Sequence, residues 1–499
     1  MPTEPHRAAA EVPPTGETYW RADDLGKALP NEEHAISVCL PRWQDVIDYE
    51  EGRERVMSAL RAGYPRFVLP PALRELHRQL DPESGGALAL AFGSEAAAER
   101  CVKHVEGAGG LARCLTGPPG VPAWVRFGCG DSMQAGWLVW RTFGEGLSSR
   151  AARAVLDGVA RGVAEETAAG DAVRRRIADE HGVDPGNVFL TASGMAAVGL
   201  VARLVARARP GLPLVQLDFP YVDVPRLLRM VAERIDVPRA SHEALAALEA
   251  RIREGRVGGL FTEVPANPLL GQVDLARLGE VARTAGVPIV GDDTVASNFN
   301  IGLLPQVDLV TCSLSKWFNG RCNLLAGAVV VNPEGKHAAQ WKHGIEQDGI
   351  TPPGAGDLIE LEKNSLDFPA RMKTINRNAA AAIEWMRGHP AVSGVWAAEA
   401  DGGLWRTGRG AGGLFTFSLH GGEAVAAAFY DAVELPKGPS FGADFTMLCP
   451  YTLLAHYDEL EDVARLGVRR DQIRISIGRE PQHWILERLE AGLAAATRA

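Results

Sequence analysis

The stretch Ser313-Leu314-Ser315-Lys316-Trp317-Phe318-Asn319-Gly320 decides the fold, and it directly follows an apolar run at 307–312. The apolar run predicts a buried strand, so Lys316 stands where that strand ends. A lysine at the end of a buried strand is poorly explained as a solvated surface charge. It is better explained as an amine held in a pocket, where it can act as nucleophile and base. Ser313 and Ser315 offer hydroxyl donors to a phosphate. S-x-S-K is nevertheless a common tetrapeptide, so its meaning depends on the sequence around it.

An alternation of strands and helices surrounds this stretch. We expect strands at 188–191, 212–218, 258–263, 287–291, 307–312 and 326–331, with helices at 196–208, 241–253 and 275–285. Near-continuous apolar strands between amphipathic helices predict a mostly parallel sheet covered by helices on both faces. Beyond residue 359 the sequence predicts one long helix running through Met372 and Ala382. A smaller α+β domain should follow it, with strands at 413–419 and 473–477.

Polar side chains stand at several expected strand ends, which is where open α/β sheets bind their ligands. Ser193-Gly194-Met195 closes one strand and opens a helix, so its backbone N–H groups can bind a phosphate; an ordinary tight turn explains it equally well. Asp292 ends the strand at 287–291. A buried carboxylate there needs a partner, which is either a pyridinium N–H or the backbone of the next helix.

Two further residues suit a flat ring and an amino-acid substrate. Tyr221 follows the strand at 212–218, and its ring can stack on a heteroaromatic ring or simply belong to the core. Arg474 interrupts the apolar strand at 473–477 and can bind a substrate carboxylate or form a structural salt bridge. Together with the Schiff-base lysine, these residues indicate pyridoxal 5'-phosphate (PLP), which serves as an electron sink for carbanions.

The bulk properties exclude several other classes of protein. The 499 residues carry a net charge of −10, so we expect no partnership with nucleic acid or an anionic membrane surface. The chain has no run of 18 apolar residues and no visible secretory signal, which predicts no membrane span. Its seven cysteines are scattered and never in C-x-x-C spacing, which argues against a disulfide framework and a zinc site. We therefore expect a cytoplasmic protein that binds no metal.

Taken in chain order, the motifs resemble the PLP-dependent Cys/Met metabolism family of trans-sulfuration enzymes. The motifs that carry the resemblance are T-A-S-G-M-A-A-V (191–198), F-P-Y (219–221), E-V-P-A-N-P-L-L (263–270), V-G-D-D-T (290–294), S-L-S-K-W-F-N-G (313–320) and I-R-I-S-I-G (473–478). The long fungal-type cystathionine γ-synthases are the most similar members, on G-Y-P-R-F (63–67) and G-P-S-F-G-A-D-F-T (438–446). The resemblance implies the α/β fold of the fold-type-I PLP-dependent transferases, which is like that of aspartate aminotransferase. It also implies a seven-stranded sheet and a smaller C-terminal domain.

The resemblance also implies a role for individual residues. Lys316 would hold the cofactor and shuttle protons, Asp292 would pair with the pyridine nitrogen, and Tyr221 would stack on the ring. The other implied cofactor contacts come from Ser193, Gly194, Met195, Ser313 and Ser315 around the phosphate and from Asn267 near the phenolic oxygen. The substrate α-carboxylate would lie on Arg474, with Ser440 beside it.

The Y-x-R motif of the family is matched by Tyr64 and Arg66, which would reach the cofactor phosphate of a neighbouring subunit. The resemblance therefore implies a homodimer or homotetramer with shared active sites. On this basis the chain divides into a flexible arm (1–34), an N-terminal extension that contributes to the dimer and the active site (35–185), a large PLP-binding domain (186–370) and a small C-terminal domain (371–499).

The implied reaction is γ-substitution on an O-acyl-L-homoserine, in which L-cysteine attacks and cystathionine is released. Other family reactions remain open: a γ-lyase, an O-acylhomoserine sulfhydrylase, or a γ-substitution by a carbon nucleophile. An aminotransferase fits the motifs less well, as does a PLP-fold protein kept only for binding or regulation. The chain also departs from the family pattern, with Asp293 where Asn is usual and Val222-Asp223-Val224 where G-G-T is usual after the tyrosine. These departures leave the substrate open.

Overall fold

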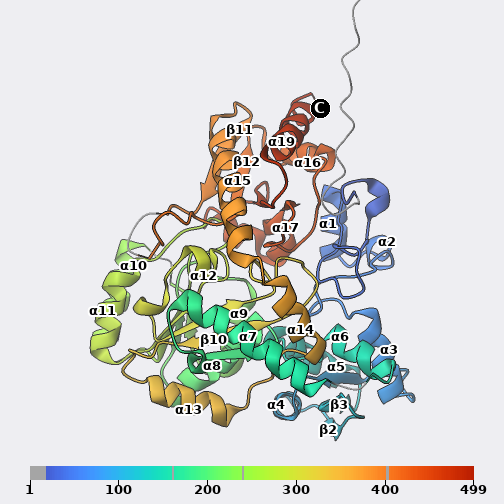
Figure 1. Ribbon diagram of the computed structural model, residues 1–499, viewed down its shortest axis with the longest axis vertical. Coiled ribbons are helices and arrows are strands. Elements are labelled where there is room, and N and C mark those ends of the chain that lie inside the picture. The colour runs from blue at the N-terminus through green and yellow to red at the C-terminus, as the bar shows by residue number, and fades with distance from the viewer. Residues whose placement is uncertain (1–17, 160–161, 239–240, 401–403, 499) are drawn as a thin grey trace, which may run out of the picture.

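A seven-stranded sheet forms the centre of the molecule in the computed structural model, which describes residues 18–159, 162–238, 241–400 and 404–498 (Figure 1). Its strands are β4 (Val188–Thr191), β5 (Leu214–Gln216), β6 (Ile235–Asp236), β7 (Gly259–Glu263), β8 (Ile289–Asp292), β9 (Leu309–Ser313) and β10 (Gly327–Val331). They lie in the order β4-β10-β9-β8-β7-β5-β6, and only β10 runs antiparallel to its neighbours. The predicted mostly parallel sheet is confirmed.

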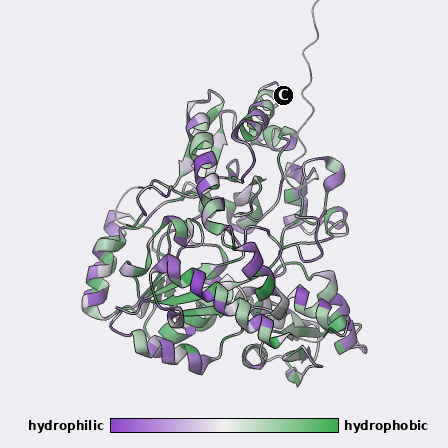
Figure 2. Ribbon diagram, viewed as in Figure 1, coloured by the Kyte–Doolittle hydropathy of each residue, from purple (hydrophilic) through white to green (hydrophobic). Residues whose placement is uncertain are grey.

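Both faces of the sheet are buried at β5, β7 and β10, whose residues are all buried and mostly apolar. Along β10, Ala328 and Val330 belong to one core, while Val329 and Val331 belong to the other. The first core includes side chains from α7 (Val163–His181), α10 (His242–Arg253) and α11 (Leu275–Ala285); the second includes those of α8 (Gly194–Ala208) and α9 (Asp223–Val231). Figure 2 shows these hydrophobic strands at the centre of the molecule. Helices thus cover both faces, as predicted.

The segment between the Y-x-R motif and the large sheet contains a small second sheet with helices packed against it. Its antiparallel sheet has the order β1-β3-β2, made of β1 (Ala89–Phe92), β2 (Ala112–Thr116) and β3 (Ala123–Phe127). The helices α3 (Pro71–Leu80), α4 (Glu95–Gly107) and α5 (Gly130–Phe143) pack against it. Side chains of this unit share one core with α8, so the unit sits directly on the large domain (Figure 1).

The C-terminal domain contains a second antiparallel sheet, in the order β11-β12-β14-β13. Its elements are β11 (Val392–Ala397), β12 (Leu414–Leu419), β13 (Met447–Cys449), β14 (Ile473–Ser476), α16 (Gly422–Ala432), α17 (Tyr451–Ala455) and α19 (Gln482–Ala496). The long helix predicted through Met372 and Ala382 is confirmed, but it begins at residue 368, some way beyond residue 359. The structure has α14 (Ala355–Asn364) and α15 (Phe368–Gly388), because Pro369 lies in the first turn of α15, where proline favours a helix start.

The N-terminal arm is also more ordered than predicted. Residues 1–17 lie outside the described residues, but Tyr19 and Leu29 are both buried, in a cluster with Phe445 and Met447 of the C-terminal domain. This packing corrects the prediction of a flexible arm for residues 18–34.

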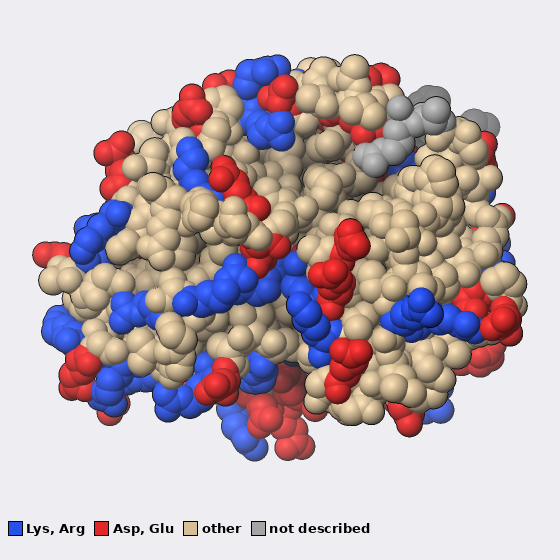
Figure 3. All heavy atoms as spheres, turned by 90° about the horizontal axis from the view of Figure 1, so that it is seen from below, with Lys and Arg blue, Asp and Glu red and all other residues tan. Residues whose placement is uncertain are grey.

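Within the described ranges, no helix combines the length and the apolar composition that crossing a bilayer requires. On the face seen from below, Lys and Arg side chains lie interspersed with Asp and Glu (Figure 3).

Candidate active site

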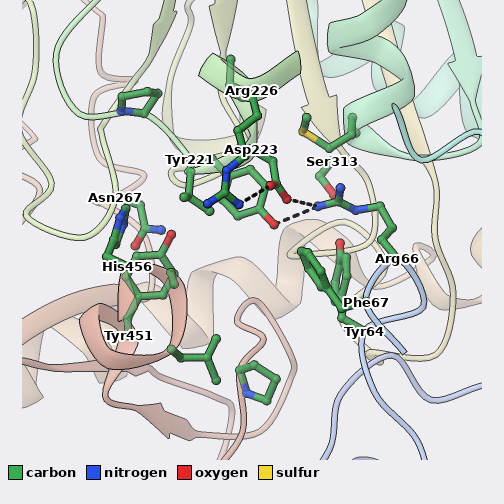
Figure 4. Close-up of a pocket in the computed structure, with 18 of the residues that line it drawn as sticks. Tyr64, Arg66, Phe67, Tyr221, Asp223, Arg226, Asn267, Ser313, Tyr451 and His456 are labelled. Carbon is green, nitrogen blue, oxygen red and sulfur yellow. Dashed lines mark hydrogen bonds and ion pairs between the residues drawn. The ribbon is translucent and has the colours of Figure 1, made fainter. Parts of the chain in front are cut away.

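A cavity of about 700 Å³ lies where β7, β8 and β9 end, between the large sheet and the C-terminal domain. Residues from distant parts of the chain line it. The predicted site residues among them are Tyr64, Arg66, Ser193, Gly194, Met195, Tyr221, Asn267, Asp292, Ser313, Lys316 and Arg474. Figure 4 shows part of this set. The predicted residues therefore converge on one cavity, with the exceptions of Ser440, which touches Lys316, and Ser315.

Lys316 is held by one hydroxyl and two aromatic rings. Its Nζ donates a hydrogen bond to Ser440 Oγ at 3.1 Å and lies 4.8 Å from the ring centroid of Tyr64 and 4.9 Å from that of Phe441. The side chain is buried, and the residue is 9% exposed. The aromatic faces attract the ammonium group without forming a fixed ion pair. The amine is therefore available for chemistry inside the cavity.

The first turn of α8 is the place where the sequence predicts a phosphate cradle. Ser193 caps this helix, accepting a hydrogen bond from Ala196 N and donating one to Gly144 O. The N–H groups of Gly194 and Met195 stand at the positive end of a 15-residue helix. A Cβ on Gly194 would lie 2.7 Å from Ser313 Cβ, so only glycine allows the helix and the lysine segment to meet this closely.

Ser315, which the sequence also predicts at the phosphate, is bonded to the backbone beside the cavity. It is 1% exposed and does not line the cavity. Its hydroxyl donates to Ala326 O at 3.2 Å and accepts from Ala326 N at 3.0 Å. Ser315 thus fixes the lysine segment to the residue before β10. The tetrapeptide S-x-S-K could not distinguish this structural role from phosphate binding.

Arg66 places a positive charge beside the cradle. Its guanidinium donates to Tyr221 Oη at 2.8 Å and pairs with Asp223 Oδ2 at 3.2 Å, and it also donates to the carbonyl oxygen of Arg141 (Figure 4). Arg66 is 2% exposed and Asp223 is 1% exposed. Tyr64 and Arg66, which the resemblance assigns to the cofactor phosphate of a neighbouring subunit, both line the cavity of this single chain.

Asp292 ends β8 with both carboxylate oxygens in use. They accept hydrogen bonds from Thr294 N and Thr311 Oγ1, both at 2.9 Å. Burial raises the pKa of the Asp292 carboxyl, and the two donors oppose this rise. A cationic N–H in the cavity would favour the ionised carboxylate further, as a protonated pyridine nitrogen does. Asp292 therefore suits its predicted role as the partner of the pyridine nitrogen of PLP.

Glu263 holds the backbone of Tyr221 and Asn267 in place. We did not predict this role, although Glu263 is the first residue of the E-V-P-A-N-P motif. Its two oxygens accept hydrogen bonds from the backbone N–H groups of Tyr221 at 2.9 Å and Asn267 at 3.1 Å. Burial and the nearby Asp292 raise the pKa of Glu263 to about 8. At neutral pH the Glu263 carboxyl is therefore largely neutral, and it positions Tyr221 and Asn267 without adding a full charge to the cavity.

Arg474 stands at the other end of the cavity, on β14. Its guanidinium donates to Asn267 Oδ1 at 3.4 Å and to the carbonyl oxygens of Pro439 and Ser440 at 2.8 and 3.2 Å. The ring centroid of Tyr451 lies 4.3 Å from the guanidinium carbon. These acceptors are neutral, and burial lowers the pKa of Arg474. A substrate carboxylate would supply the anion that suits this buried guanidinium.

Asp293, the unusual residue of the V-G-D-D-T motif, points away from the cavity. It is fully buried, and its Oδ2 lies 3.7 Å from Nε2 of His181, the last residue of α7. Burial and Asp292 raise the pKa of Asp293 to about 7, while burial lowers the pKa of His181 to about 4. Two adjacent carboxylates therefore stand at the end of β8, of which Asp292 alone faces the cavity.

The residues present fit a phosphorylated heteroaromatic aldehyde. A helix N-terminus and Arg66 offer the charge that a phosphate needs, and Gly194 leaves room for its approach. Tyr221 offers an aromatic face, Asp292 an anion, and Lys316 an amine. Each functional group of PLP therefore has a chemically suitable neighbour in this cavity.

Comparisons with known proteins agree with this geometry. The family described as "Cys/Met metabolism PLP-dependent enzyme" matches residues 167–494. The chain is 28% identical to the cystathionine gamma-synthase-like enzyme iboG2 of Amanita muscaria, over 94% of this chain and 96% of that protein. It is 30% identical to the L-2-amino-4-chloropent-4-enoate dechlorinase/desaturase of Streptantibioticus cattleyicolor, over 92% and 96%. A solved cystathionine gamma synthase from Xanthomonas oryzae pv. oryzae superimposes with a TM-score of 0.59 at 26% identity, covering 66% of this chain and 86% of that one.

Proposed function

The chain belongs to the Cys/Met metabolism PLP-dependent enzyme family, and from this premise we propose that it catalyses γ-substitution on an O-acyl-L-homoserine. It is a PLP-dependent enzyme of the cystathionine γ-synthase-like group. In the proposed reaction L-cysteine replaces the acyloxy group at Cγ, and cystathionine is the product. We also propose that it works on small-molecule amino acids in the cytoplasm, a setting in which its seven free cysteines would stay reduced.

One observation carries this proposal: Ser440 touches both Lys316 and Arg474. Its hydroxyl accepts from Lys316 Nζ at 3.1 Å, and its carbonyl oxygen accepts from Arg474 at 3.2 Å. A substrate whose carboxylate binds Arg474 therefore has its α-carbon close to the amine of Lys316. That proximity suits proton transfer at Cα, which every reaction of this kind requires.

When bound, PLP supplies an electron sink that stabilises negative charge at the substrate α-carbon. Lys316 Nζ removes the proton from Cα and returns protons later, since its aromatic neighbours leave it free to move. Arg474 orients the substrate through its carboxylate, and Asn267 steadies the guanidinium. Arg66 and the first turn of α8 would hold the phosphate, while Asp292 would hold the ring nitrogen.

A second candidate function is elimination from Cγ without an added nucleophile. The relative named a dechlorinase/desaturase covers almost the whole chain, and the name of its substrate places chlorine on C4, which is the γ-carbon of an amino acid. Loss of a γ-substituent is common to both reactions. They differ in whether a thiol then attacks, so the same cavity can serve either.

Mass spectrometry of products distinguishes the two functions. Purified enzyme would be incubated with O-acetyl-L-homoserine, O-succinyl-L-homoserine and L-2-amino-4-chloropent-4-enoate, each with and without L-cysteine. Cystathionine that forms only when cysteine is present supports the first function. Chloride release, or a keto acid that forms regardless of cysteine, supports the second. Turnover that persists in Lys316→Ala would contradict both.

A further inference from the structure

We propose that Asp293 and His181 are positioning residues for the ring nitrogen of PLP, and that they act through Asp292 from behind the cavity. An ionised Asp293 places a second negative charge next to Asp292 and so favours a protonated ring nitrogen, whereas a neutral Asp293 does not. This inference rests on the proposed cofactor site and is independent of the proposed substrate. Asp293 follows β8 and His181 ends α7, so neither belongs to the N-terminal segment that carries the Y-x-R motif.

Asp293 and His181 form a buried pair. Their side chains are 0% and 1% exposed, and Asp293 Oδ2 lies 3.7 Å from His181 Nε2. Among the described residues, neither the two carboxylate oxygens nor the two ring nitrogens have a nitrogen or oxygen partner at hydrogen-bond geometry. The Cys312 thiol is near Asp293, but a thiol is only a weak donor. Four buried polar atoms of this kind are unfavourable unless a proton is shared between them. The pair therefore holds a titratable proton.

Asp293 is connected to Asp292 by the backbone and by Thr311 of β9. The two aspartates are consecutive, so their side chains leave the end of β8 on opposite sides, and Asp292 alone lines the cavity. The Thr311 hydroxyl donates to Asp292 Oδ2 at 2.9 Å, and its carbonyl oxygen accepts from Asp293 N at 3.3 Å. A charge on Asp293 is therefore close to Asp292, and its burial leaves that charge poorly screened by water.

The groups around the pair determine when Asp293 ionises. Burial and Asp292 raise the pKa of Asp293 to about 7, against the opposing effects of Cys312 and of Arg406, which lies in the segment before β12. Burial and Arg406 lower the pKa of His181 to about 4, so this ring is neutral at neutral pH. Two adjacent carboxylates oppose each other's ionisation. A cationic ring nitrogen against Asp292 would relieve this repulsion, so PLP binding and the ionisation of Asp293 should favour each other.

The carboxylate at position 293 is also a departure from the family pattern, which has Asn there. An amide next to His181 could form a hydrogen bond but could not ionise. Asp293 therefore adds to the back of the cavity a pH-dependent charge that the usual residue lacks. Asp293→Asn is accordingly a direct test, because it keeps the shape of the side chain and removes its ionisation.

The experiment compares the binding of two cofactors, PLP and its carbon analogue, in which C–H replaces the ring nitrogen. The dissociation constant of the analogue divided by that of PLP measures the contribution of the ring nitrogen, because the phosphate and the aldehyde are the same in both. Fluorescence titrations between about pH 6 and pH 8 would give this ratio for the unchanged protein, Asp293→Asn and Asp308→Asn. Asp308 is the matched control: burial also raises its pKa, but it precedes β9, at the end of the strand away from Ser313 and the cavity.

At about pH 8 the ratio should be about tenfold larger in the unchanged protein and in Asp308→Asn than in Asp293→Asn. This difference should shrink toward about pH 6, where Asp293 regains its proton. A ratio that is the same in all three proteins, or a difference that does not change with pH, would overturn the inference. A purely structural role of Asp293 would change both dissociation constants together and leave the ratio constant. Glu263 also titrates near Asp292, but all three proteins keep it, so its effect cancels.

If Asp293→Asn yields no folded chain, Asp293→Ser takes its place, since serine also lacks a carboxyl group and is smaller. All titrations are made without a substrate, so failure of the proposed γ-substitution in the product assay would leave these ratios as they are. An unchanged protein that bound neither PLP nor its analogue would overturn the inference together with the cofactor site on which it rests.

Discussion

Replacing Gly144 by alanine should lower the stability of the fold and weaken PLP binding. Gly182→Ala is the control, because it carries the same backbone strain at a place far from any other atom. Both glycines end a helix in the left-handed conformation, with φ of 62° at Gly144 and 70° at Gly182. A Cβ on Gly182 meets nothing within 4 Å, so its cost is the backbone conformation alone, about 1 kcal/mol. A Cβ on Gly144 would lie 2.3 Å from Ser193 Oγ.

The additional cost at Gly144 follows from the bonds that Ser193 would lose. Its hydroxyl caps α8 and donates to Gly144 O, and each bond contributes about 1 kcal/mol. Gly144→Ala should therefore lose about 2 kcal/mol more stability than Gly182→Ala. It should also raise the PLP dissociation constant by about tenfold, because Ser193 and Arg66 both border the phosphate cradle.

Two measurements test these predictions. Urea unfolding of each variant without PLP gives the loss of stability, and fluorescence titration of each variant with PLP gives the dissociation constant. Gly182→Ala should bind PLP like the unchanged protein. Equal binding of PLP by both variants would refute the prediction, since Gly144 would then have no part in positioning Ser193 or Arg66.

Three further predictions concern single side chains. Lys316→Ala should abolish turnover and prevent borohydride from fixing PLP, with an unchanged circular dichroism spectrum; fixed PLP in this variant would refute the assignment. Arg474→Lys should raise KM for the amino-acid substrate about tenfold or more with a smaller change in kcat, because lysine cannot form the bidentate contact; an unchanged KM would place the carboxylate elsewhere. Asp293 has a raised pKa in the folded chain, so its contribution to stability is lost as pH rises from about 4 to 7. Asp293→Asn should therefore gain stability relative to the unchanged protein as pH rises from about 4 to 7, by up to about 4 kcal/mol, and a constant difference in the free energy of unfolding across that range would contradict it.

The strand ends of the large domain were predictable because they depend on local pattern. Apolar runs flanked by amphipathic helices determine where β4, β8 and β9 end, and the ends of parallel strands meet at one edge of a sheet. Lys316, Asp292 and the first turn of α8 could therefore be assigned to one site from the order of the residues alone. Residues at the ends of parallel strands meet at one edge of the sheet, whichever segments of the chain pack against that edge.

Features that depend on contacts between distant segments were not predictable in this way. The sequence could not show that Ser315 bonds to Ala326. Both serines of S-x-S-K stand just before the lysine, and the motif alone does not show which hydroxyl faces the cavity. It could not place Arg66 opposite Asp223, because 157 positions separate them. The one signal in the sequence was Asp223 itself, a carboxylate at a motif position where glycine is usual.

The antiparallel strand β10 has a consequence for how the protein folds. It pairs with β4, which precedes it by more than a hundred residues, and its first residue, Gly327, lies opposite Thr191 at the entrance to the phosphate cradle. Pairings of such long range form slowly, because the intervening chain must first be ordered. The cradle can therefore take shape only late in folding. PLP should bind to a nearly complete chain and should not accelerate the early steps of refolding.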